Sequence, residues 1–201
     1  MAIGHLIMMP FEITMTESNG DTKGPEFKEW PKIHRLNRDI IITEKIDGTN
    51  AQIYIDESEN FFAGSRTRWV TPENDNFGFG KWAYEHKEDL LKLGPGRHYG
   101  EWWGNGIQRG YGQPNGMRWF SLFNTTRWKD MIFPLIGLTT VPILYEGPFS
   151  QAMIEHCLKD LKLNGSKAAP FMDPEGIVVY HTHGNVAFKV TLGGDGHKGE
   201  K

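Results

Sequence analysis

The sequence predicts an α+β fold in which short strands outnumber helices. Two segments have the composition of strands: residues 39–43 form a β-branched run, and residues 51–55 alternate apolar with polar side chains. Two longer segments, 79–93 and 151–163, repeat apolar residues at helical spacing. Nothing between them has the composition of a linker, so we expect one folded domain over residues 1–192, followed by a flexible tail, 193–201.

The first two strands are separated by residues 44–50, which contain an Asp-Gly dipeptide. This dipeptide is typical of a tight turn, so the segment predicts strand, turn and strand. In the second strand, Ile53 and Ile55 fall on one face, and Gln52 and Tyr54 on the other. Residues 61–63 are predicted to add a third strand that closes a meander.

The remaining elements follow from periodicity and from their end signals. Residues 79–93 are predicted to be helical up to Gly94-Pro95-Gly96, and residues 151–163 from an N-cap at Ser150 to a stop at Asn164-Gly165. Further strands are expected at 98–103 and 118–123, and a final hairpin at 176–181 and 186–191.

Composition excludes several classes of protein. The 201 residues carry 25 acidic and 22 basic side chains, a net charge of −3, so the chain as a whole is not a polycation that coats nucleic acid. The single cysteine, Cys157, excludes an internal disulfide and a thiolate zinc site. The longest apolar stretch, 131–145, is short and broken by proline and glycine, which argues against a membrane span. With no secretion signal at residues 1–10, we expect a cytoplasmic protein.

Chemistry is concentrated around Lys45-Ile46-Asp47-Gly48. Alone, this string has an ordinary explanation, a surface lysine beside a turn. Three later residues favour a functional role over this explanation. Glu101 ends a strand, Glu175 begins one, and Lys189 lies in the middle of an apolar strand. A lysine there is costly to bury unless it has an anionic partner.

These strings, in this order, resemble the signature of the covalent nucleotidyltransferases, which comprise ATP-dependent RNA and DNA ligases and mRNA capping enzymes. Thr43 and Glu44 before the lysine, and Asn50 after it, look most like the RNA ligase 2 branch. The resemblance runs from about Thr43 to Thr191. It implies two antiparallel sheets flanked by helices, with the nucleotide between them. Family ligases generally carry an added C-terminal domain, but only ten residues follow Thr191, so we expect no OB domain here.

The resemblance also assigns roles to residues. Lys45 would be the nucleophile that forms a lysyl-AMP intermediate, supported by Asp47, and Lys189 would pair with the α-phosphate. Glu175 would hold a divalent metal, Mg²⁺ or Mn²⁺, and Glu101 would bind the ribose hydroxyls. These residue types suit phosphoryl transfer, which depends on positioning and on neutralising charge.

The remaining implied roles concern the base and the phosphates. Backbone atoms of Thr43 or Glu44 would contact the adenine edge, and Asn50 would also lie at the nucleotide. Phe123 would stack on adenine. Arg66, within Ser65-Arg66-Thr67, resembles an arginine that touches the nucleotide and nucleic-acid phosphate, and Arg68 is placed to hold phosphate as well.

The expected function is therefore ATP-dependent joining of 5′-phosphate and 3′-hydroxyl ends of RNA. The expected partner is nucleic acid, and no membrane association is expected. The chain is expected to act as a monomer. A partner protein could supply additional contacts with nucleic acid. Three alternatives remain open: a DNA nick ligase, a capping guanylyltransferase, and a nucleotide-binding module without turnover. Thr191 favours the last of these, because the family usually has a second lysine at that position. The tryptophans at 69, 102, 103, 119 and 128 are either core residues or platforms for bases.

Overall fold

The computed structural model describes residues 26–193, so the expected tail, apart from residue 193, lies outside the described residues. The chain divides into two units, residues 1–33 and 34–201. In the first unit, residues 26–33 form neither helix nor strand. All of the helices and strands reported below belong to the second unit.

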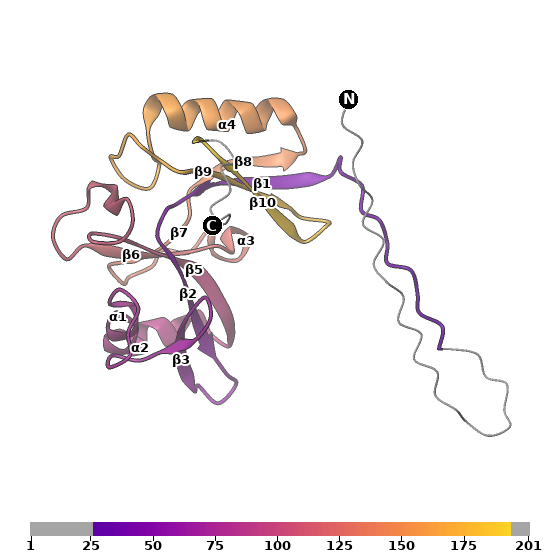
Figure 1. Cartoon of the computed structure of the whole chain (residues 1–201). Helices are drawn as coiled ribbons and strands as arrows, with labels where there is room; N and C mark the ends of the chain where they lie inside the picture. Colours follow the sequence, from indigo (N-terminus) through magenta and orange to yellow (C-terminus); the bar gives the residue numbers. More distant parts are fainter. Residues whose placement is uncertain (1–25, 194–201) are drawn as a thin grey trace, which may run out of the picture. The chain divides into compact units, whose positions relative to one another are not determined.

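The second unit contains two sheets (Figure 1). The four-stranded sheet has the order β10-β9-β1-β8 and is antiparallel throughout, with strands β1 Asp39–Lys45, β8 Ile143–Pro148, β9 Gly176–His181 and β10 Val186–Thr191. The six-stranded sheet has the order β4-β3-β2-β5-β6-β7. Its strands are β2 Thr49–Ile55, β3 Phe61–Ser65, β4 Trp69–Val70, β5 Gly96–Gly104, β6 Arg118–Leu122 and β7 Leu138–Thr140, the last parallel to β6.

One long helix covers the four-stranded sheet. Helix α4, Gln151–Asn164, lies along that sheet in Figure 1, and its buried residues Ile154, Cys157 and Leu161 join Ile40 and Ile42 of β1 in one apolar cluster. The Ser150 side chain caps the helix by accepting a hydrogen bond from the Met153 N–H. The predicted helix, its N-cap and its glycine stop are confirmed.

Short helices cover one face of the six-stranded sheet. They are α1 Phe79–Glu85, α2 Lys87–Leu90 and the 3-10 turn Leu91–Leu93. The single helix predicted over 79–93 is wrong at His86, where φ is −112° and ψ is 21° and the helix is interrupted. The remaining helices are α3 Thr125–Trp128 and the 3-10 turn Gly110–Gly112. Ile53 and Ile55 are buried in the core beneath these helices, as their alternation predicted.

The strand, turn and strand prediction at 39–55 is right about the strands and wrong about their pairing. Strand β1 pairs with β8 and β9, whereas β2 pairs with β3 and β5. The Asp47-Gly48 segment therefore carries the chain from one sheet to the other, as Figure 1 shows. The physical reason is burial: β1 is buried on both faces in the middle of its sheet, so it takes two sequence-distant neighbours.

Three of the five tryptophans considered above are core residues. Trp102, Trp103 and Trp128 are buried, whereas Trp69 is 45% exposed. In residues 26–193, no helix is long and apolar enough to cross a membrane.

Gly176, at the start of β9, has a φ of 153°, and a Cβ there would overlap the carbonyl oxygen of Val190 in β10. We expect Gly176→Ala to lower the free energy of unfolding by about 2 kcal/mol or more. Gly193→Ala is the matched control, because nothing lies within 4 Å of the added methyl group; it should change stability by less than about 0.5 kcal/mol. Urea unfolding of both variants measures the difference, and equal stabilities would contradict the close packing of β9 on β10.

Candidate active site

A cavity of about 830 Å³ is lined by residues of both sheets. Strands β1, β9 and β10 contribute from the four-stranded sheet, β2 and β5 contribute from the six-stranded sheet, and residues 123–126 complete the wall. Among the residues with predicted roles, those that line it are Thr43, Glu44, Lys45, Asn50, Glu101 and Phe123.

The registers of the strands show which side chains share the cavity face. Thr43 pairs with Val178, which pairs with Lys189, so these three residues form one row across the sheet. Because Thr43 and Val178 line the cavity, Lys189 lies on the same face. Its side chain is exposed on the edge strand β10 and has no ion-pair partner among residues 26–193. The expectation that burial would force an anionic partner on Lys189 is therefore wrong, because an edge position leaves the ammonium in water.

Lys45 ends β1 and forms an ion pair with Glu175. The distance from Lys45 Nζ to Glu175 Oε2 is 2.5 Å, and the side chains are 24% and 13% exposed. Lys45 lies opposite Gly176 in the β1–β9 ladder, so the residue before Gly176 is held close to the lysine by strand pairing. The structure thus brings the predicted nucleophile and the predicted metal ligand together across 130 residues of sequence.

Glu101, on β5, approaches the same turn from the other sheet. Its Oε1 accepts a hydrogen bond from the Gly48 N–H at 3.0 Å, and its Oε2 accepts one from Asn50 Nδ2 at 3.4 Å. Burial raises the pKa of Glu101 to about 7, against the opposing effect of the positive charge on Lys45. Glycine is required at position 48, since a Cβ there would overlap the Trp102 carbonyl oxygen.

Asp47 is held by two residues that the sequence analysis missed. Its N–H donates to the Tyr111 hydroxyl at 3.0 Å, and its Oδ2 accepts from Arg109 Nε at 3.0 Å. Arg109 also donates to Oδ2 of Asp173 at 2.7 Å and to its backbone carbonyl at 2.8 Å. Arg109 therefore ties the turn that follows Lys45 to the segment just before Glu175. No local pattern reveals this, because the partners lie 62 and 64 residues away.

The Glu44 carboxylate does not face the cavity as the side chain of its neighbour Lys45 does. Successive side chains alternate along β1, which places Glu44 on the face of buried Ile42. Its Oε2 accepts hydrogen bonds from the N–H groups of Lys167 and Ala168, at 2.7 and 3.2 Å. The structure is thus compatible with the expectation that backbone atoms, and not this carboxylate, contact the base.

Phe123 is a half-exposed aromatic residue on the cavity wall, 43% exposed. Its N–H donates to the Tyr99 carbonyl, which anchors the loop after β6 to β5. The next residue, Asn124, caps α3 by accepting a hydrogen bond from the Arg127 N–H at 3.1 Å. The backbone that carries the Phe123 ring is therefore held at the cavity wall, directly after the end of β6.

The two arginines predicted to hold phosphate lie between β3 and β4, outside the cavity wall. Arg66 is exposed. The Arg68 guanidinium donates to the backbone carbonyls of Asn74 and Asp75, both at 2.8 Å, and so fastens the following loop. Their roles toward nucleic acid stay predictions.

A carboxylate suited to a divalent metal, that of Glu175, lies beside Lys45. No group of three or more His, Cys, Asp or Glu side chains with metal-site spacing occurs within the described residues. Mg²⁺ and Mn²⁺ sites on phosphate substrates need only one or two carboxylates, because phosphate and water supply the other oxygen ligands. Glu175, paired with Lys45 at 2.5 Å, fits that requirement.

Solved structures with the same fold were found. One is a mutant of Naegleria gruberi RNA ligase with ATP and Mn, at 18% identity and a TM-score of 0.56, covering 78% of this chain and 50% of that one. Another mutant of the same ligase, with AMP and Mn, gives 19% identity, a TM-score of 0.55 and the same coverage. The chain thus spans about half the length of these proteins. A search of curated proteins gives no match.

A scan against protein-family models matches the model of the RNA ligase family over residues 38–191. The match runs from the start of β1 to the end of β10 and includes the cavity, the Lys45–Glu175 ion pair and Glu101. The chain belongs to the RNA ligase family.

Proposed function

We propose that this chain is an ATP-dependent RNA ligase that works through a covalent AMP on Lys45. The observation that carries the proposal is the Lys45 amine at the cavity wall, paired with Glu175 and facing the buried carboxylate of Glu101. Family membership and the likeness to the Naegleria gruberi ligase with ATP and Mn support the choice of nucleotide, metal and RNA. The acting unit is one copy of the chain, and its macromolecular partner is RNA.

In the first step, Lys45 Nζ attacks the α-phosphorus of ATP. A P–N bond forms, the P–O bond to the β-phosphate breaks, and pyrophosphate leaves with the electron pair. Lysine attacks only as a neutral amine, so its ammonium must first lose a proton. Glu175 Oε2, 2.5 Å from Nζ, is the nearest described acceptor for that proton. A bound Mg²⁺ or Mn²⁺ would supply charge neutralisation at the phosphate oxygens.

In the next two steps, AMP passes to RNA and is then released. A 5′-phosphate oxygen of RNA attacks the lysyl-AMP phosphorus, and the P–N bond breaks. A 3′-hydroxyl then attacks the activated 5′-phosphorus, which forms the phosphodiester and expels AMP. Lys189, exposed on the cavity face, is the cation placed to meet the phosphates in these steps.

Glu101 is the candidate acceptor for the ribose hydroxyls. Each carboxylate oxygen already accepts one hydrogen bond, from Gly48 and from Asn50, and retains a further lone pair. Only the ionised form offers acceptors on both oxygens, and burial makes ionisation costly, with a pKa of about 7. Nucleotide binding is therefore coupled to the ionisation of Glu101.

The first prediction concerns the covalent intermediate. Incubation of the full chain with α-labelled ATP and Mg²⁺ or Mn²⁺ should give a labelled protein, whereas Lys45→Ala should give no label. A Lys92→Ala variant, which removes an exposed lysine paired with Asp89, should label like the wild type. Absence of label on wild type contradicts the mechanism, and equal label on Lys45→Ala contradicts the assigned nucleophile.

Substrate choice is tested on the same protein with 5′-phosphorylated RNA and DNA of one sequence. The proposal predicts joined RNA and little joined DNA, with ATP and not GTP as the nucleotide. Joined DNA without joined RNA would make the chain a DNA ligase, and label from GTP alone would make it a guanylyltransferase.

The second prediction is a pH dependence. The folded-state pKa of Glu101 lies above its ordinary value of 4.5, so the folded protein holds this proton more tightly than the unfolded chain. The free energy of unfolding should thus fall as pH rises from about 4.5 to about 7, by up to about 3 kcal/mol. Urea unfolding across this range should show the fall in wild type and a smaller one in Glu101→Gln.

The affinity for ATP should move the opposite way with pH. It should rise through about pH 7 in wild type, as Glu101 becomes the double acceptor, and the rise should be lost in Glu101→Gln. If both proteins show the same pH dependence of stability and of ATP affinity, Glu101 does not have the assigned role.

The third prediction concerns Arg109, which contacts Asp47 and Asp173 but does not line the cavity. Arg109→Ala should slow lysyl-AMP formation about 10- to 100-fold, because it frees the turn that follows Lys45 and the segment before Glu175. The affinity for ATP should change little. Single-turnover labelling over a range of ATP concentrations separates the two quantities, and a change confined to ATP affinity would contradict a positioning role.

A further inference from the structure

Three aromatic side chains on neighbouring strands of the six-stranded sheet form an exposed group. They are Tyr54 on β2, Phe62 on β3 and Trp69 on β4, here called the aromatic surface. The ring centroids are 6.1 Å apart for Tyr54 and Phe62, 5.5 Å for Phe62 and Trp69, and 6.3 Å for Tyr54 and Trp69. Phe62 is 40% exposed and Trp69 is 45% exposed. Ring contacts across strands stabilise a sheet, but they do not require ring faces that remain open to water.

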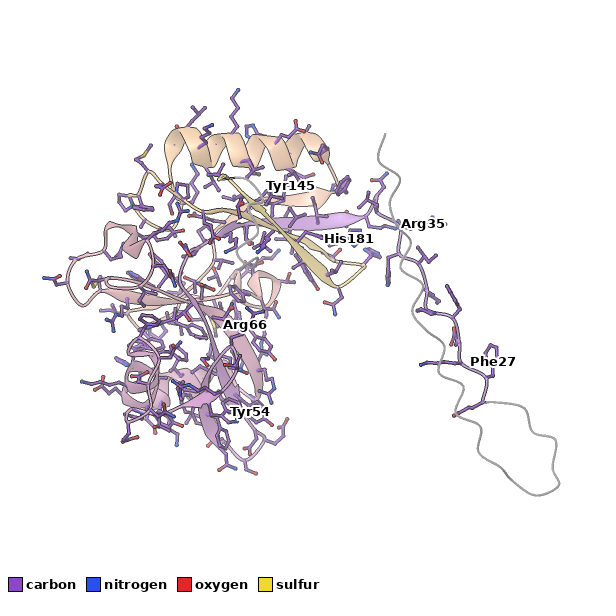
Figure 2. The ribbon with its side chains drawn as sticks, viewed as in Figure 1. Phe27, Arg35, Tyr54, Arg66, Tyr145 and His181 are labelled. Carbon is purple, nitrogen blue, oxygen red and sulfur yellow. The ribbon has the colours of Figure 1, made fainter. Side chains whose placement is uncertain are left out.

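The aromatic surface lies on the same face of the sheet as the cavity. Ile53 and Ile55 of β2 point into the core, so Asn50 and Tyr54 share the opposite face. Asn50 lines the cavity. Tyr54 also lies directly opposite Arg97 of β5, and Arg97 lines the cavity too. The surface therefore continues the cavity wall outward along β2 and β5. Figure 2 labels Tyr54 on this sheet.

Arg97 joins the aromatic surface to the cavity and carries an uncompensated charge. Its guanidinium carbon lies 4.5 Å from the Tyr54 ring centroid and 5.5 Å from that of Trp69. The group donates one hydrogen bond, to Gln52 Oε1 at 3.1 Å, and no carboxylate within residues 26–193 pairs with it. A planar cation beside partly exposed aromatic rings suits a ligand with flat bases and anionic phosphates.

Unpaired nucleotides fit this surface better than a duplex does. Bases within a duplex are stacked on each other and cannot lie on a protein ring, whereas single-stranded bases stack on exposed aromatic side chains. We propose that the aromatic surface and Arg97 bind unpaired nucleotides of the RNA strand whose end enters the cavity. This rests on the proposed function and narrows its substrate to ends that carry a single-stranded segment.

The test uses the full chain and a short, fluorescently labelled, single-stranded RNA with a 5′-phosphate. Phe62→Ala and Trp69→Ala should each weaken binding about tenfold, as expected for the loss of one stacking ring. Neither residue lines the cavity, so lysyl-AMP formation from ATP alone should stay within about twofold of wild type. Phe77→Ala is the matched control: Phe77 is 50% exposed and precedes α1, whose core contacts lie on the other side of the sheet, and it should bind RNA like wild type.

Conservative variants separate stacking from folding. Phe62→Leu and Trp69→Leu keep apolar bulk but lack a flat ring, so they should adenylylate normally and still bind RNA weakly. Wild-type RNA affinity in the alanine variants overturns the proposal. So does a parallel loss of lysyl-AMP formation in alanine and leucine variants alike, which would make the rings structural.

The fully paired form of the same RNA gives the remaining outcomes. Its affinity should be the same in wild type and variants; an equal loss for duplex and single strand would make this a duplex-binding surface and overturn the proposal. The test also distinguishes failure of this inference from failure of the proposed function. A wild type that binds single strands through these rings but never forms lysyl-AMP refutes the ligase mechanism alone.

Discussion

The ion pair between Lys45 and Glu175 is the contact on which the site depends. It joins the last residue of β1 to the residue before β9, and it lies where the chain leaves the four-stranded sheet for the six-stranded one. Strand β1 is buried between β8 and β9, so the backbone at Lys45 has little freedom. A flexible lysine side chain is thereby presented from a rigid strand, which is the arrangement that phosphoryl transfer needs.

Contacts from the six-stranded sheet hold the other side of the turn. Glu101 accepts the Gly48 N–H, and Arg109 joins Asp47 to Asp173. Glu101 thereby lies near the lysine in largely buried surroundings, where the two charges interact more strongly than in water. The raised pKa of Glu101 is the cost of that burial. Catalytic positioning and the pH dependence of stability thus have the same physical origin.

The sequence was informative where the signal is local. The final hairpin, the helix after Ser150 and the faces of β2 all follow from spacing and periodicity, and the structure confirms them. The sheet to which each strand belongs did not follow, because pairing depends on residues about a hundred positions apart, as between β1 and β8. Strand β8 ends in Glu146-Gly147-Pro148, which in the sequence alone could be either a strand end or a turn. Arg109 and Tyr111 were missed for the same reason, since their contacts with Asp47 are long-range.

The central claim is that this geometry directs AMP to one lysine. Peptide mapping by mass spectrometry, after incubation of the wild-type chain with ATP and Mg²⁺, tests it most directly. The account predicts that AMP is found on the peptide that contains Lys45 and on no other. AMP on a peptide containing Lys189, which also lies on the cavity face, would contradict it, as would a chain that carries no AMP at all.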